Sequence, residues 1–225
     1  MAIVKKYPAK VKTVFNFIGG VYTLELESLG KPFKYDPGQF LHLAIDRYDP
    51  SGQWPESRCF SIQSNPDEET IKITYAVKGK FTRLMEQQLQ VGSTVWLKLP
   101  FGNLFTQPHN KTNTVFIAGG TGITPFLSLF THSSFKEYIN PHIYLGFRSK
   151  SYNIYATELS FINQLDPKIY FEDIDGLLSI IDIFSENGKE SNYFISGPPL
   201  MIKTFKNELI TSGLPENQVL TDDWE

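Results

Sequence analysis

The sequence predicts two domains of different class, a small antiparallel β-barrel in residues 1–107 and an open parallel α/β sheet in residues 108–225. Three observations lead to this prediction. The first half of the chain consists of short strand-like runs between turns, whereas the second half alternates strands with helices. A Gly-Gly-Thr-Gly turn joins the first strand of the second half to a helix. A length of 225 residues is sufficient for two domains of ordinary size.

The predicted barrel strands are rich in β-branched and aromatic residues, and several alternate apolar with polar positions. Turn residues separate them at Pro37-Gly38, Pro50-Ser51-Gly52 and Asn65-Pro66-Asp67. One helix is expected from Thr82 to Leu89, with Thr82 as its N-cap. A set of short strands with one helix favours a small antiparallel barrel. The expected strands lie within residues 13–28, 40–48, 58–64, 70–77 and 93–99.

The second half begins after a polar bridge at residues 107–112, where the spacing of apolar residues changes. Strands that alternate with helices of this length are typical of parallel βαβ units, and hence of a nucleotide-binding sheet. The expected strands are residues 113–120, 142–147, 168–173, 192–196 and 218–223, and the expected helices are 124–135, 154–165 and 199–213.

The charge distribution argues against nucleic acid as a partner. The formal net charge is −3; residues 1–110 carry 13 basic and 10 acidic side chains, and residues 111–225 carry 8 and 14. An acidic second half lacks the clustered positive charge that phosphate backbones require.

The composition also limits metal and redox chemistry on this chain. Cys59 is the single cysteine, which excludes an intrachain disulfide and an iron–sulfur cluster held by four thiolates of this chain. The four histidines lack metal-ligand spacing, so no metal site is expected. The N-terminal residues lack the apolar core of a signal peptide, and no run is long enough for a membrane helix. A cytoplasmic protein that does not bind a membrane is therefore expected.

The Gly-Gly-Thr-Gly turn predicts a phosphate site. Gly119, Gly120 and Gly122, with Thr121 between them, follow an apolar strand and precede a helix that begins near Thr124-Pro125. Glycines allow backbone amides to approach an anion closely, and proline in the first helical turn costs no needed donor. The positive end of the helix would then face the phosphates.

A second constellation lies in the predicted barrel. Arg58, Phe60 and Ser61 share one strand, and the segment Lys78-Gly79-Lys80-Phe81-Thr82 leads into the predicted helix. An arginine fork suits a phosphate, while an aromatic ring and a hydroxyl suit a planar ligand. Each residue taken singly has an ordinary structural role, as an ion pair, a core ring or a helix cap. Their joint occurrence indicates a second anion site.

These motifs, in this order, resemble the ferredoxin:NADP reductase family, which pairs a flavin-binding Greek-key barrel with a nicotinamide-nucleotide domain. Arg58-Cys59-Phe60-Ser61 is similar to the family's Arg-x-Tyr-Ser motif. The resemblance implies that Arg58 contacts the flavin phosphates, Phe60 the isoalloxazine and Ser61 the region of N5. Lys78, Gly79, Phe81 and Thr82 match the loop that binds the flavin pyrophosphate. The segment Leu99 to Phe105 is similar to the one that leads out of the family's barrel.

The second half continues the resemblance. The turn from Gly119 to Pro125 is similar to the family's nucleotide-pyrophosphate turn, and Arg148 matches a position near the nucleotide. Ser196-Gly197-Pro198-Pro199-Leu200-Met201 resembles a nicotinamide-site motif that usually begins with cysteine, so Ser196, Gly197, Pro198 and Met201 are implied there. Near the C-terminus, Asp222 matches an acid and Trp224 an aromatic residue that covers the flavin.

The resemblance implies a reductase that takes hydride from NADH or NADPH to flavin N5 and passes electrons to a separate acceptor, either an oxygenase component or a ferredoxin-like protein. Ser61, Ser196 and Asp222 are the implied catalytic residues. FAD is expected rather than FMN. Two alternatives remain: a flavin- and nucleotide-binding subunit of a larger complex, and a module that has lost turnover.

The sequence leaves open whether NADH or NADPH donates the hydride. Arg148 and Lys150 favour a 2′-phosphate, whereas Glu172-Asp173 favour free ribose hydroxyls. The balance of these residues leans slightly to NADH.

Overall fold

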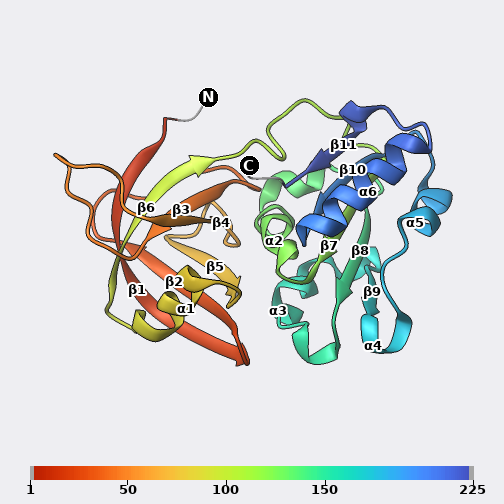
Figure 1. Cartoon of the computed structure of the whole chain (residues 1–225). Coiled ribbons are helices and arrows are strands. Elements are labelled where there is room, and N and C mark those ends of the chain that lie inside the picture. Colours follow the sequence, from red (N-terminus) through yellow and green to blue (C-terminus); the bar gives the residue numbers. More distant parts are fainter. Residues whose placement is uncertain (1–2, 223–225) are drawn as a thin grey trace. The chain divides into compact units, whose positions relative to one another are not determined.

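The computed structural model describes residues 3–222, which divide into two compact units with the boundary between Asn103 and Leu104. Figure 1 shows an antiparallel sheet with one helix in the first unit and a parallel sheet with several helices in the second. The two fold classes predicted from the sequence are confirmed.

The first unit is one curled antiparallel sheet (Figure 1). Its strand order is β4-β3-β6-β1-β2-β5, so the last strand in sequence lies between the first and the third. The edges of this open barrel are β4 and β5. The elements are β1 (Lys5–Ile18), β2 (Val21–Ser28), β3 (Phe40–Ala44), β4 (Ser57–Ser61), β5 (Thr70–Ala76), α1 (Lys80–Gln88) and β6 (Thr94–Phe101).

Alternating residues of these strands fill the core of the first unit. In the β3–β4 pair, Leu41 lies opposite Phe60 and Leu43 lies opposite Arg58. Leu41, Leu43 and Phe60 are buried, whereas Arg58 on the same face is exposed. Phe81 and Met85 of α1 pack into the same core. The start of β4 and the start of α1 therefore lie close together, with the Arg58 guanidinium over the Phe81 ring.

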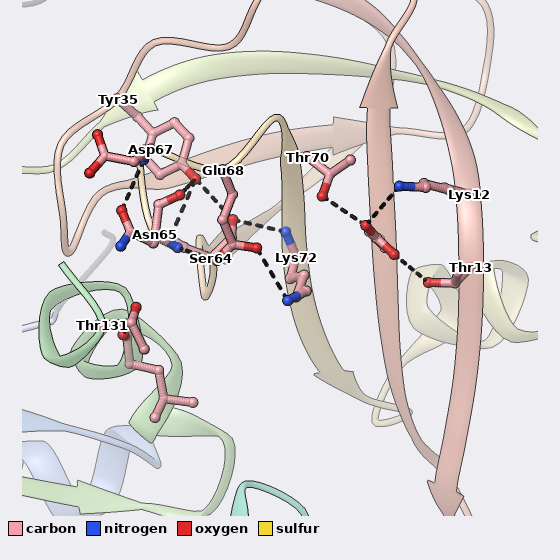
Figure 2. Close-up of polar contacts among 12 residues, drawn as sticks. Lys12, Thr13, Tyr35, Ser64, Asn65, Asp67, Glu68, Thr70, Lys72 and Thr131 are labelled. Atoms are coloured by element: carbon pink, nitrogen blue, oxygen red, sulfur yellow. Dashed lines mark hydrogen bonds and ion pairs between the residues drawn. The ribbon is translucent and has the colours of Figure 1, made fainter. Parts of the chain in front are cut away.

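A polar cluster outside the core ties β1, β2 and β5 together (Figure 2). The carboxylate of Glu25 accepts hydrogen bonds from Lys12, Thr13 and Thr70 at 3.3, 3.2 and 2.8 Å. Partial burial raises the pKa of Glu25, but the bonds from Thr70 and Lys12 outweigh it and hold the pKa below its usual value.

The second unit is a five-stranded parallel sheet of order β11-β10-β7-β8-β9. The chain runs outward from β7 to β9 and then returns to the other side of β7, so the order reverses between β7 and β10. The strands are β7 (Thr114–Gly119), β8 (His142–Phe147), β9 (Lys168–Phe171), β10 (Asn192–Ser196) and β11 (Val219–Thr221).

Helices cover both faces of this sheet. On one face, α2 (Thr124–Phe130) and α3 (Ala156–Leu159) pack against Phe116, Leu145 and Phe194. On the other, α5 (Ile180–Asn187) and α6 (Pro199–Thr211) pack against residues such as Ile117 and Tyr193. The short helix α4 (Glu172–Asp175) follows β9 directly. A parallel sheet with both faces buried explains why its strands are continuous apolar runs.

Several predicted boundaries are wrong. The barrel helix begins at Lys80, and Gly79 is its N-cap, so Thr82 is the third helical residue and not a cap. The helix predicted for residues 124–135 ends already at Phe130. A 3₁₀ turn at Gly120–Ile123 precedes it. Helix α5 was not predicted at all. Within residues 3–222, no helix is long and apolar enough to cross a membrane.

Candidate functional site

The β4 strand places the three predicted flavin residues in different environments. Arg58 is exposed, Phe60 is 7% exposed and packs edge-on against Tyr75 at 6.0 Å between ring centroids, and Ser61 is buried. The Arg58 guanidinium carbon lies 5.1 Å from the centroid of the Phe81 ring, at the start of α1. Arg58 and the start of α1 are therefore neighbours in the structure, although they lie in separate stretches of the sequence.

The loop before α1 is ordered by Thr82. Its hydroxyl oxygen accepts the N–H groups of Lys78 and Gly79 at 3.0 and 3.1 Å, and the hydroxyl lies 3.2 Å from the Gly79 carbonyl oxygen. Two of the amides predicted to hold a pyrophosphate thus already have a partner. The first helical N–H groups, at Lys80 and Phe81, have no intrahelical acceptor, as at any helix start. These amides and the Arg58 guanidinium are the donors that fit an anion here.

A carboxylate already occupies the Arg58 fork. Glu56 Oε1 accepts from Arg58 at 2.9 Å, and the two side chains are 61% and 52% exposed. Exposed ion pairs contribute little to stability, so a phosphate with several acceptor oxygens can replace this carboxylate. Glu56 was missed in the sequence because its role depends on a turn geometry that no motif records.

Cys59 lies on the opposite side of β4 from Arg58. Its sulfur is 3.6 Å from Nε2 of His42, the residue directly across from it in β3. Burial raises the pKa of the Cys59 thiol, so the thiol is mainly protonated and unreactive at neutral pH.

In the second unit, two turns meet where the strand order reverses. A methyl group at Gly122 would lie 2.4 Å from Gly197 Cα, and one at Gly119 would lie 2.8 Å from Met201 Sδ and 3.0 Å from Pro198 Cδ. The turn after β7 and the turn after β10 therefore pack backbone against backbone. In open parallel sheets, ligands bind outside the carboxyl ends of the strands at such a reversal.

The remaining residues of the predicted phosphate turn are well ordered. Thr124 donates its hydroxyl proton to the Thr121 carbonyl at 3.0 Å, and Pro125 stands at the start of a fully buried α2. Gly120 has a φ of +55°, a left-handed conformation, and open space where a side chain would project. Its backbone therefore needs glycine, while its surroundings leave room for a ligand.

A hydroxyl–carboxylate pair borders this glycine contact. Ser196 is 1% exposed and donates from Oγ to Oδ2 of Asp222 at 3.1 Å, while the Asp222 N–H donates to the Ile195 carbonyl at 3.0 Å. The structure thus joins two of the three predicted catalytic residues. Trp224, predicted to cover the flavin, lies outside the described residues.

Arg148 follows β8 directly and is exposed. Its guanidinium carbon lies 5.3 Å from the Tyr152 ring centroid, a cation–π contact that was not predicted from the sequence. Leu178 was also missed; its side chain would be 2.9 Å from a methyl group at Gly146. Both contacts depend on tertiary packing rather than on a local pattern.

Comparison with known proteins agrees with this architecture. Residues 6–134 match the model of a family described as an FAD-binding domain. The reductase component of propane 2-monooxygenase from Mycolicibacterium smegmatis is 27% identical over 91% of this chain and 63% of its own length. Reductase component 1 of terephthalate 1,2-dioxygenase from Comamonas sp is 31% identical over 56% of this chain and 36% of its own length. The chain thus spans less than two thirds of these relatives.

Solved structures share the fold over almost the whole chain. A ferredoxin NADP+ reductase from Neisseria gonorrhoeae, solved with FAD and NADP bound, aligns with a TM-score of 0.78 at 19% identity, covering 96% of this chain and 98% of its own. Phthalate dioxygenase reductase aligns with the same TM-score and identity over 96% of this chain and 67% of its own. At this identity the likeness establishes the two-unit architecture.

Proposed function

Because the chain belongs to the FAD-binding domain family, among the ferredoxin:NADP reductase-like flavoproteins, we propose that it is a reductase that takes electrons from NADH or NADPH and passes them to a separate acceptor protein. Residues 1–107 would hold FAD, and residues 108–225 the nicotinamide nucleotide. The reversal of strand order beside Gly119, Gly122 and Ser196 is the observation that carries the proposal, because it places a backbone cradle at the carboxyl edge of the sheet.

The residues present fit both groups. Arg58 and the first amides of α1 supply positive charge for the flavin pyrophosphate, and Gly120 leaves open space at the turn after β7 for the nucleotide pyrophosphate. Bound FAD supplies a group that accepts a hydride and releases electrons one at a time. The protein must then position its ligands and control protons around them.

Ser196 and Asp222 are suited to proton control. The hydroxyl of Ser196 donates to the Asp222 carboxylate, which fixes the serine rotamer and leaves its oxygen lone pairs for a further donor. We assign to this pair the role of orienting the nicotinamide ring and holding a proton, with Ser61 as a donor toward the flavin. Serine replaces the family's usual cysteine with a harder atom of similar size, so hydride transfer is retained in this proposal.

The acceptor in this proposal is an oxygenase component or a ferredoxin-like protein. The supporting observation is that the relatives are reductase components of a propane 2-monooxygenase and a terephthalate 1,2-dioxygenase. Residues 1–225 contain a single cysteine, so a four-thiolate cluster that accepts these electrons would lie outside them. We place this exchange in the cytoplasm, where a free thiol stays reduced.

The test is purification without added cofactor, an absorbance spectrum, and anaerobic titration with each nucleotide. We expect a yellow protein whose visible absorbance is bleached by NADH or NADPH and which releases FAD rather than FMN on denaturation. A colourless protein that binds neither flavin would overturn the proposal. Flavin that is bound but not bleached would instead favour a non-catalytic module, and tight co-purification with other subunits would favour a complex-bound subunit.

The predicted C-terminal aromatic has its own test. Truncation after Asp223 removes Trp224 and should alter the flavin spectrum and the affinity for nucleotide. Unchanged spectra and kinetics in the truncated protein would remove Trp224 from the flavin site and leave the other assignments intact.

A further inference from the structure

The carboxyl ends of β8 and β9 place opposite charges side by side. Phe147 and Phe171 are paired in register and end their strands, so Arg148 and Glu172 are the next residues on neighbouring strands. The Asp173 N–H donates to the Arg148 carbonyl at 3.3 Å, which fixes Asp173 beside the arginine backbone. A ligand at this edge therefore meets Arg148 and two carboxylates together, while Lys150 lies two residues further along, at the start of the 3₁₀ turn Lys150–Tyr152.

Neither charge is neutralised by the other. The Arg148 guanidinium lies over Tyr152, and within residues 3–222 no ion pair joins Arg148 to a carboxylate. Glu172 and Asp173 are exposed and have no ion-pair partner in the same range. Asp175 differs, because its carboxylate accepts the Phe171 N–H at 2.8 Å and so serves the turn itself.

This edge lies on the path of an extended dinucleotide. Gly119 of β7 is paired with Gly146 of β8, and Ala118 with Ser196 of β10, so four neighbouring strands end in one row. From β10 to β9 the row covers three strand spacings, about 14 Å. A dinucleotide with its nicotinamide near Ser196 and its pyrophosphate at the glycine turn extends its adenosine along this row toward β8 and β9.

We propose that Glu172 and Asp173 make the nucleotide site select NADH over NADPH, an inference that rests on the proposed function. A 2′-phosphate brings between one and two extra negative charges next to two carboxylates, whereas free ribose hydroxyls can donate hydrogen bonds to them. Arg148 is engaged with Tyr152, and Lys150 lies in the turn beyond β8 rather than on the row of strand ends, so the two carboxylates adjoining Arg148 decide the preference. The guanidinium over the Tyr152 ring instead offers a surface for the adenine ring.

The experiment measures kcat/KM for NADH and NADPH in the wild-type protein and in Glu172→Gln, Asp173→Asn and the double variant. Wild type should prefer NADH. The double variant should raise kcat/KM for NADPH about tenfold, because the repulsion between the 2′-phosphate and the two carboxylates is removed. It should change kcat/KM for NADH by less than about twofold. The gain should shrink at high salt.

Glu190→Gln is the matched control, because Glu190 is an exposed carboxylate just before β10, at the amino edge of the sheet. It removes the same charge and should leave the NADPH/NADH ratio unchanged. Wild-type preference for NADPH, or an equal change in the control, would overturn the inference. Calorimetric titration with 2′,5′-ADP and 5′-ADP gives a second readout: wild type should bind 5′-ADP more tightly, and the double variant should close the gap.

The binding readout also separates the two proposals. A protein that oxidises neither nucleotide but discriminates between the two adenosine phosphates in a Glu172- and Asp173-dependent way would refute the reductase function and support the charge selection. If wild type and double variant both oxidise the two nucleotides equally, the reductase function is supported and the charge selection is refuted.

Discussion

The two candidate phosphate sites, one in each unit, are built in opposite ways. In the curled sheet, a charged side chain on an edge strand converges with the start of a helix, and Glu56 holds that side chain in place. In the parallel sheet, the main feature is the absence of side chains at Gly119, Gly122 and Gly197, which lets two turns pack backbone against backbone. The first site depends on an ion pair, Arg58–Glu56, whose carboxylate a ligand can replace. The second depends on glycines where no side chain fits.

This difference has a physical consequence. An exposed ion pair forms and breaks at little cost, so a mutation there should change ligand affinity and leave folding nearly intact. A contact between two backbones cannot relax by choosing another rotamer, so a mutation there should damage the fold as well as the site. Substitutions in the two units test this contrast.

Gly122→Ala should have the largest effect. Its methyl group would lie 2.4 to 2.6 Å from three backbone atoms of Gly197 and Ser196, so both turns must move. We expect a loss of about 3 kcal/mol or more in the free energy of unfolding of the second unit. Hydrogen exchange resolved by peptide should show lost protection in residues 104–222 and retained protection in the first unit.

Gly120→Ala is the control for that experiment. The position has open space but a φ of +55°, so alanine meets backbone strain without a collision. The expected cost is about 1 to 2 kcal/mol. If the two alanine variants were equally destabilised, the close packing of the turns would not be the cause.

Arg58→Ala should weaken FAD binding without unfolding the first unit. Loss of a charge-assisted hydrogen bond corresponds to about 1.5 to 3 kcal/mol, or roughly 10- to 100-fold in the dissociation constant. Flavin fluorescence titration measures this affinity, and denaturant unfolding of the apoprotein should change by less than about 0.5 kcal/mol. Glu56→Gln removes the competing carboxylate and should leave FAD affinity equal or higher. A large drop in Glu56→Gln would show that the pair is needed as a unit.

Ser196→Ala removes the donor to Asp222 and should slow flavin reduction about tenfold, a modest share of what positioned acid–base groups contribute. Stopped-flow measurement of flavin bleaching at saturating nucleotide isolates this step. Ser196→Cys restores a polarisable donor of similar size and should recover most of the rate. An alanine variant as fast as wild type would limit Ser196 to a packing role.

A pH effect on the second unit should be the smallest. The imidazole of His109 lies 2.8 Å from both the Gln107 carbonyl oxygen and the Tyr138 hydroxyl, and burial lowers its pKa, although the Gln107 bond opposes this. A depressed folded-state pKa means that His109 contributes stability at pH values above its unfolded pKa, near 6.5, and loses it as the pH falls through the folded value.

Thermal unfolding between pH 7.5 and 5 should therefore show a second unit that weakens with acid, less so in His109→Gln. His42 provides the comparison in the first unit, because burial also lowers its pKa. His42→Gln should flatten the response of the first unit alone. A slope unchanged by either substitution would assign the acid sensitivity to other groups.

The sequence was most informative where burial is complete. The strands at residues 142–147 and 192–196 match the structure to the residue, because strands covered on both faces are unbroken apolar runs bounded by polar residues. Helix α5 was missed although signals were present: Ser179 caps it through Asp182 N–H, and Gly188 ends it with a φ of +70°. Only Ile180 and Ile183 of this short helix are buried, so its apolar pattern is weak.

The residues of the candidate sites also fall into those that a local pattern predicts and those that it does not. Residues in motifs, such as Arg58, Gly122 and Ser196, could be named from the sequence because their spacing along the chain carries the signal. Residues that act through a neighbour on another element, such as Glu56 on Arg58, Tyr152 on Arg148 and Leu178 over Gly146, could not. The error at Thr82 has a similar origin, since its hydroxyl does bond the helix start but from the third helical position.

The packing of Cys59 gives the molecule an internal reporter. The thiol is half-buried, because its sulfur lies beside His42 of β3 while β4 is an edge of the sheet. Separation of β4 from β3 should therefore raise the rate at which a thiol reagent reacts. Cys59 is the sole cysteine of residues 1–225 and is next to Arg58, so a change in its alkylation rate would report a change in the opening of that edge without any engineered label.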